Sequence, residues 1–322
     1  MQRGEAFNIH GQYRVQSKRS SNSSRLIGCW ALLPSDDPDS TMVNAILQSD
    51  PQWHGNAIVK IQPALIHKRE GEFANEPDIL YKRNHFVPYK RSDTMKSDIV
   101  DVRKAAERWN GRRPFAYKLF GKDVMTKVEE LIGDIERVAA LEYYMHEAGH
   151  CLGYGTANKY HDGYFQINKK TIWPLVYVEE FRADLLSFGF AASHLPPKTA
   201  TAIFLYNIML RFCSHFEGIM QCKQHPYGSI PVLLYSILRR TGFFLPISKS
   251  QKSSDFNIAS LNIKDVIQHM LALNDLARSK LVESNSLKAT DAALNAAKFY
   301  RTMLNHEIVH EFEIIISAAS IR

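Results

Sequence analysis

The most informative segment of this sequence is Met145-His146-Glu147-Ala148-Gly149-His150-Cys151-Leu152-Gly153. On an α-helix, residues four apart lie on one face, so the imidazoles of His146 and His150 can point at a single cation. Neutral imidazole suits Zn²⁺, which lowers the pKa of a bound water to roughly 7, and the neighbouring carboxylate of Glu147 can accept that proton as a general base. The segment therefore predicts a hydrolytic zinc site.

A zinc hydrolase needs a third protein ligand and leaves the fourth position to water or substrate. Glu180 follows His150 by 30 residues, enough for one loop and a second helix that returns beside the first. Asp184 lies one turn after Glu180 on the same helical face, where it can accept a hydrogen bond from the second nitrogen of a zinc-bound histidine. Glu179 either faces solvent or, as we favour, is another acceptor of this kind, because an unpaired buried charge is costly.

The combination of His-Glu-x-x-His with a downstream helical Glu-x-x-x-Asp resembles the gluzincin metallopeptidases. More narrowly, Glu179-Glu180-Phe181-Arg182-Ala183-Asp184 is similar to the Glu-Glu-Cys-Arg-Ala-Glu motif of the dipeptidyl peptidase III family, and the resemblance covers residues 140–240. It implies three zinc ligands, namely His146, His150 and Glu180. The histidines here are one residue closer together than in that family, so the metal chemistry is implied and the release of dipeptides is not.

Other roles follow from the same resemblance. It implies that Glu147 acts as the general base and later returns the proton to the leaving amine. His225 and Tyr227 stand just ahead of a predicted helix, where the family has a histidine that stabilises the transition state. Either side chain would then stabilise the oxyanion of the tetrahedral intermediate. Further candidates in the loop between the two metal-binding helices are Tyr160, His161 and Tyr164.

The five-residue pattern occurs again at His306-Glu307-Ile308-Val309-His310. So few residues follow this copy that we expect no third ligand there, and we interpret it as coincidence on an amphipathic helix. An alternative interpretation uses both copies in a helical di-iron carboxylate oxidase. Its ligands would be Glu147, His150, Glu307, His310, Glu180 and either Glu136 or Glu142. A third interpretation is a catalytically inactive zincin-like scaffold.

The two parts of the chain differ in their patterns. Apolar residues recur at helical spacing from Asp123 into the first motif, and further helices are predicted at about 174–186, 198–217, 228–241, 262–283 and 288–317. The first 25 residues are polar and expected to be flexible, and strands are expected at 26–33 and 56–66. We therefore predict a mainly α (α+β) protein. Residues 1–100 form a smaller, partly β N-terminal region, and residues 101–322 form a helical, zincin-like catalytic domain.

The composition is typical of a soluble globular protein, with 45% hydrophobic and 23% charged residues. The net charge is +7, but Lys and Arg are scattered, so no nucleic-acid partner is expected. No apolar run approaches the roughly 20 residues that cross a bilayer, no signal peptide is recognisable, and the four cysteines are too few for a disulfide framework. We expect a cytoplasmic zinc hydrolase that acts on a peptide or small amide and has no membrane partner.

Overall fold

The computed structural model describes residues 6–15, 24–32, 59–70, 79–82, 96–151, 166–167, 170–171, 173–213, 228–246, 255–282 and 289–321. Side chains are described from Ala106 onward, with exceptions that include Glu147 and His150. Strands occupy the N-terminal part and helices the remainder, and the change falls between Asp101 and Val102. The prediction of a mainly α protein with a β-containing N-terminal region is confirmed. A domain boundary at residue 100 stays a prediction.

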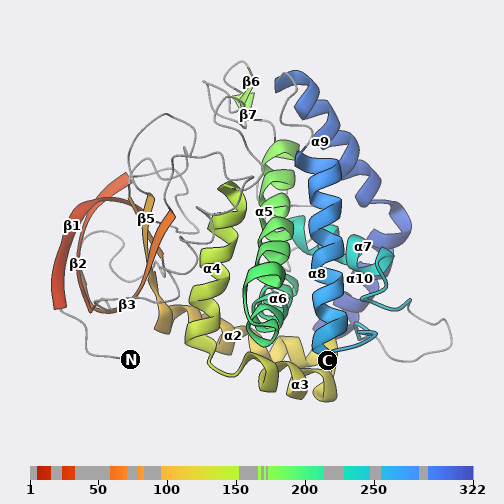
Figure 1. Cartoon of the computed structure of the whole chain (residues 1–322), viewed down its shortest axis with the longest axis horizontal. Coiled ribbons are helices and arrows are strands. Elements are labelled where there is room, and N and C mark those ends of the chain that lie inside the picture. Colours follow the sequence, from red (N-terminus) through yellow and green to blue (C-terminus); the bar gives the residue numbers. More distant parts are fainter. Residues whose placement is uncertain are drawn as a thin grey trace.

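The N-terminal strands form a closed barrel in the order β1-β2-β3-β5-β4 (Figure 1). Their bounds are β1 Ala6–Val15, β2 Ser24–Leu32, β3 Val59–Glu70, β4 Ile79–Lys82 and β5 Lys96–Asp101. All pairs are antiparallel except β3 with β5, and β4 closes the barrel by pairing with β1. The expectation that the first 25 residues are a flexible lead-in is wrong for Ala6–Val15. Those residues pair with β2 from Ala6 to Arg14 and with β4 from Tyr13 to Val15, and their alternating apolar and polar side chains suit a strand.

The helices pack beside the barrel. Their bounds are α2 Val102–Phe120, α3 Lys122–Ile132, α4 Ile135–Cys151, α5 Trp173–His194, α6 Pro197–Phe212, α7 Ile230–Arg240, α8 Ile263–Ala277, α9 Ala289–Met303 and α10 His306–Ile321. A π-helical segment, η3 Arg278–Val282, extends α8, and a small hairpin of β6 Gln166–Ile167 and β7 Lys170–Thr171 precedes α5. Figure 1 shows α4 between the barrel and α5, with α8 on the other side of α5.

The continuous helix expected from Asp123 into the first motif is two helices, α3 and α4. The chain breaks at Gly133, whose φ of 61° lies in the left-handed region that glycine adopts without strain. Asp134 then opens α4, since its carboxylate accepts a hydrogen bond from the amide of Arg137 at 3.1 Å. This break sets the direction of α4, and with it the direction of the first histidine.

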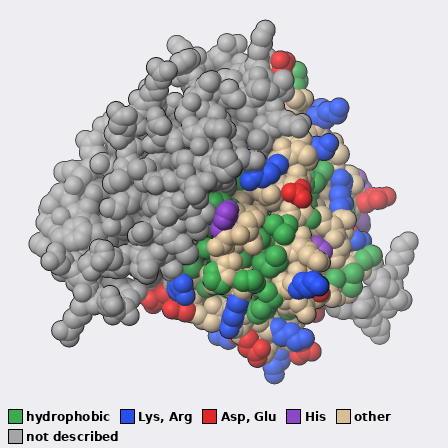
Figure 2. All heavy atoms as spheres, viewed as in Figure 1, with side chains coloured by type: hydrophobic (Ala, Val, Ile, Leu, Met, Phe, Trp, Pro, Cys, Tyr) green, Lys and Arg blue, Asp and Glu red, His purple; other side chains and the backbone are tan. Residues whose placement is uncertain are grey.

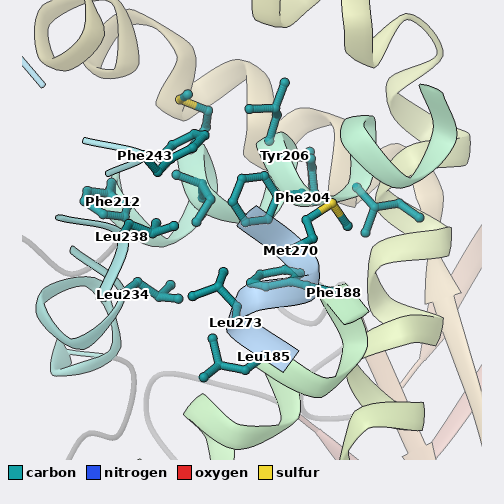
Figure 3. Close-up of a cluster of buried hydrophobic side chains, with 14 of the residues drawn as sticks. Leu185, Phe188, Phe204, Tyr206, Phe212, Leu234, Leu238, Phe243, Met270 and Leu273 are labelled. Atoms are coloured by element: carbon teal, nitrogen blue, oxygen red, sulfur yellow. The ribbon is translucent and has the colours of Figure 1, made fainter. Parts of the chain in front are cut away.

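Helix α5 is the centre of the helical core. Every residue from Tyr177 to Ala191 is buried, as expected for a helix enclosed on all sides. Its neighbours α6, α7 and α8 supply many of the other core side chains, and Figure 3 shows part of this cluster. The labelled members are Leu185, Phe188, Phe204, Tyr206, Phe212, Leu234, Leu238, Phe243, Met270 and Leu273. Polar side chains on such a helix are expensive to bury, so those on α5 need an explanation.

The surface agrees with the scattered charges of the sequence. On the face that Figure 2 shows, Lys and Arg are interspersed with Asp and Glu over the described part. No helix of that part has both the length and the apolar character that a membrane span requires.

Candidate metal centre

Helices α4 and α5 approach unusually closely at Gly149. A Cβ atom built on Gly149 would lie 2.1 Å from the carbonyl oxygen of Ala183, far inside van der Waals contact. Only glycine therefore permits this crossing. Ala183 lies between Glu180 and Asp184 in sequence, so the close approach brings the acidic residues of α5 against the histidine motif of α4.

His146 is buried at this crossing and contacts two carboxylates of α5. Its Nδ1 donates a hydrogen bond to Oδ1 of Asp184 at 2.8 Å, and its Nε2 lies 3.4 Å from Oε2 of Glu180. Burial lowers the pKa of His146, but the hydrogen bonds and charges of Asp184 and Glu180 together raise it to about 10. Nδ1 of the imidazole thus faces Asp184, and Nε2 faces Glu180.

Asp184 is fully buried and is held by helix α6. Arg211 donates from Nε to Oδ2 at 3.0 Å and from Nη2 to Oδ1 at 2.9 Å, and Asn207 donates from Nδ2 to Oδ1 at 3.2 Å. Burial would raise the pKa of Asp184, but Arg211 and His146 hold it well below its usual value. Asp184 is therefore an ionised acceptor, as the second-nitrogen role predicted for it requires.

Glu142 lies one helical turn before His146 and belongs to the same polar cluster. Its Oε1 accepts a hydrogen bond of 2.6 Å from Nδ2 of Asn207. Burial raises the pKa of the Glu142 carboxyl above 4.5, and the charge of Arg211 offsets this only in part. Asn207 and Arg211 were not predicted from the sequence. They interrupt the apolar run of α6 one turn apart, which is the same signal that marked the acidic residues of α5.

Glu179 faces a different partner. Its carboxylate accepts hydrogen bonds from Nε and Nη2 of Arg182 at 2.8 and 2.7 Å, and both side chains are buried. A doubly hydrogen-bonded arginine stabilises a carboxylate that would otherwise be costly to bury. Of the two interpretations of Glu179, exposure to solvent is wrong, while its role as a further hydrogen-bond acceptor for a metal ligand stays a prediction.

Several predicted site residues lie outside the described part of the structure. They are the side chains of Glu147 and His150, and the residues Tyr160, His161, Tyr164, His225 and Tyr227. Among the side chains that are described, no group of three His, Cys, Asp or Glu is arranged to hold a metal ion. The side chain of His150 is not among those described. The three-ligand zinc site of His146, His150 and Glu180 therefore stays a prediction.

The second copy of the motif lies at the start of α10. His306, Glu307 and His310 are all exposed, and α10 packs on α2 and α7. Glu307 and His310 would have to face the core beside α4 to complete a di-iron site, and their exposure argues against that interpretation. This copy is a surface feature of its helix.

The fold as a whole is a helical layer with a small closed barrel beside it, and it has a counterpart among solved structures. It is similar to dipeptidyl-peptidase III from Corallococcus sp. strain EGB, with a TM-score of 0.54 at 11% sequence identity. The similarity covers 97% of this chain and 57% of that one, so this chain spans little more than half of its length. No family model and no curated protein sequence matches the chain. At this identity the likeness establishes the fold alone.

Proposed function

We propose that this protein is a zinc-dependent hydrolase of gluzincin type that cleaves peptide or amide bonds. Its metal ligands are His146, His150 and Glu180, and Glu147 is its general base. The observation that carries the proposal is the position of His146, whose Nδ1 is held by Asp184 while its Nε2 and the Glu180 carboxylate face each other at 3.4 Å. A cytoplasmic location is part of this proposal.

The described residues fit zinc in both chemistry and spacing. Two ligand atoms bound to a tetrahedral Zn²⁺ at about 2.0–2.1 Å lie roughly 3.3 Å from each other. The separation between His146 Nε2 and Glu180 Oε2 is 3.4 Å, so both atoms can face one ion with little movement of either side chain. Imidazole nitrogen and carboxylate oxygen are also a donor pair that zinc accepts.

Different residues of the chain orient the metal ligand, transfer the proton and stabilise the intermediate. Asp184 fixes a proton on Nδ1 of His146, which leaves the Nε2 lone pair for the metal. A zinc ion bound there would supply Lewis acidity that makes water a nucleophile near neutral pH. Glu147 takes the proton of the attacking water and delivers it to the leaving amine. His225 or Tyr227 stabilises the negative oxygen of the tetrahedral intermediate, with about 3 kcal/mol for each well-placed donor.

The expectation of peptide or amide substrates draws on the sequence motif and on the fold. The motif in α5 resembles a peptidase motif, and the fold is similar to that of a protein named as a dipeptidyl-peptidase. Both point to acyl transfer, for which a zinc-activated nucleophile and a carboxylate base are well suited.

The test combines metal analysis with a digest of a peptide library. Protein purified without added metal should contain about one zinc per chain, and Glu147→Gln should keep zinc and lose turnover. Glu307→Gln is the matched control, because it changes the same residue of the exposed second motif and should keep full activity. Full activity in Glu147→Gln would refute the mechanism, and wild-type zinc affinity in Glu180→Ala would refute the third ligand. Stoichiometric zinc without turnover of any peptide would instead favour an inactive scaffold.

A further inference from the structure

We propose that Arg211 and Asn207 of helix α6 are positioning residues for the metal ligand His146. This inference rests on the proposed zinc site. It concerns the polar cluster of Asp184, Arg211, Asn207 and Glu142, which lies on the side of His146 away from Glu180 and connects three helices.

Arg211 fixes the plane of the carboxylate that holds His146. Its guanidinium donates to both oxygens of Asp184, at 3.0 and 2.9 Å, and this forked contact sets the orientation of the carboxylate as well as its position. The same Oδ1 accepts the Nδ1–H of His146 at 2.8 Å. The direction of the imidazole is therefore determined by α6, a helix that carries no part of either sequence motif.

Arg211 also balances the charge of Asp184. The two side chains together carry no net charge, so Asp184 can accept a hydrogen bond from His146 without placing an uncompensated negative charge behind the metal ligand. Glu180 lies beside the other ring nitrogen, with its Oε2 3.4 Å from Nε2 of His146. This arrangement favours a strong Lewis acid at the metal position.

Asn207 of α6 hydrogen-bonds both to α4, the helix that carries His146, and to Asp184 of α5. Its Nδ2 donates to Oε1 of Glu142 at 2.6 Å and to Oδ1 of Asp184 at 3.2 Å. Glu142 precedes His146 by one helical turn on α4. Asn207 therefore holds α4 next to His146 and also contacts the Asp184 carboxylate that orients the His146 ring. Asn207 thereby fixes the rotation of α4 relative to α6.

The test measures zinc affinity by chelator competition, together with thermal unfolding of the metal-free protein. Arg211→Met should weaken zinc binding about 10–100-fold, the range expected when such a supporting contact is lost. Arg211→Lys keeps the positive charge but not the two parallel hydrogen bonds to Asp184, so it should weaken zinc binding less than Arg211→Met does. Asn207→Ala should weaken zinc binding by a smaller factor. The matched control is Arg239→Met, which breaks the partly buried pair of Arg239 and Glu311 between α7 and α10 and should leave zinc affinity at the wild-type value.

The possible outcomes separate this inference from the proposed function. Wild-type zinc affinity in Arg211→Met, or in Arg211→Lys if the methionine variant does not fold, overturns the positioning role. Equal losses of zinc affinity in Arg211→Met and Arg239→Met would mean that only general stability matters, and would also overturn it. A zinc-binding wild type without peptidase activity refutes the proposed function alone, whereas a wild type without zinc affinity refutes both.

A separate observation concerns the exposed second motif. The rings of His306 and His310 are stacked on α10, with centroids 6.1 Å apart and planes inclined by 24°. Both side chains are exposed, so their rings can rotate to aim one nitrogen each at a shared ion without repacking the core. We infer that this pair is a surface chelating site for a late transition-metal ion, with Cu²⁺ bound most tightly.

Titration calorimetry with Cu²⁺ alone tests this second site. Wild type should bind one equivalent more than His310→Ala or His306→Ala, and Glu307→Gln should match wild type. The same uptake in wild type and His310→Ala would overturn the inference. The measurement does not depend on zinc at α4, because all variants share that site unchanged.

Discussion

Replacement of Gly149 by alanine should disrupt the metal centre through a single methyl group. Its Cβ would lie 2.1 Å from the carbonyl oxygen of Ala183, whereas real Cβ atoms essentially never come within 3.0 Å of a neighbour. The obstacle is backbone, which no side-chain rotation can relieve. Helices α4 and α5 must therefore separate by about 1 Å, and such overpacking costs about 1–3 kcal/mol of unfolding free energy.

The same displacement acts on the site itself. His146 lies one turn before Gly149, and Glu180 lies one turn before Ala183, so separation of the helices changes the 3.4 Å distance between their facing atoms. A misplacement of about 1 Å in a catalytic constellation lowers the rate about 10²-fold. We expect Gly149→Ala to lose zinc affinity and peptidase activity by at least this factor while keeping its helical circular dichroism.

Two other glycines provide controls of opposite sign. A Cβ on Gly111 of α2 meets nothing within 4 Å, so Gly111→Ala should stabilise the protein by about 0.5–1 kcal/mol. A Cβ on Gly189 of α5 would lie 2.1 Å from Cβ of Asn274 on α8, so Gly189→Ala should destabilise the core with little change in zinc affinity. Urea unfolding and chelator competition measure the two quantities. Wild-type zinc affinity in Gly149→Ala would refute the argument that this crossing builds the site.

Three further predictions concern the polar cluster and the core. Asp184→Asn should weaken zinc binding about 10–100-fold, as measured by chelator competition. It should also destabilise the fold by about 3–5 kcal/mol in urea unfolding, because it leaves Arg211 without its anionic partner. Glu142→Gln removes an acid whose pKa is raised above 4.5 by burial, so ionisation of Glu142 opposes folding. The unfolding free energy of the variant should equal that of wild type below pH 4.5. It should exceed the wild-type value as the pH rises above 4.5. A difference in unfolding free energy that is independent of pH would contradict this. Phe212→Ala should cost about 3–5 kcal/mol, because that ring contacts Phe120, Tyr235, Phe244, Phe256 and Phe312; a loss under 1 kcal/mol in thermal or urea unfolding would show that the cluster tolerates the cavity.

The helical core could be predicted from the sequence because its signals are local. The predicted helices at 198–217, 228–241 and 262–283 correspond to α6, α7 and α8, each of which carries apolar residues at helical spacing. The proximity of His146, Glu180 and Asp184 also followed from spacing alone. The break at Gly133 was missed, although Gly followed by Asp is a recognisable end of one helix and start of another.

The barrel and the supporting cluster were harder to predict because they depend on distant partners. Strand β1 does carry a local signal, since Phe7, Ile9, Tyr13 and Val15 alternate with polar residues, but its place in a closed barrel depends on pairing with β2 and β4. The partners of Asp184 come from α6, and nothing in the spacing of the two motifs indicates which helix would supply them. A long-range hydrogen-bond network of this kind is visible only once the helices have been packed.

The burial of α5 has a consequence for how the protein would respond to metal. Helix α5 carries Glu180 and Asp184 and is enclosed on every side, so its amide hydrogens should exchange with deuterium only when the whole helical domain unfolds. The ligand that α5 provides is therefore already in place before any ion arrives. Zinc binding should then slow exchange across the entire core equally, instead of protecting one locally ordered segment.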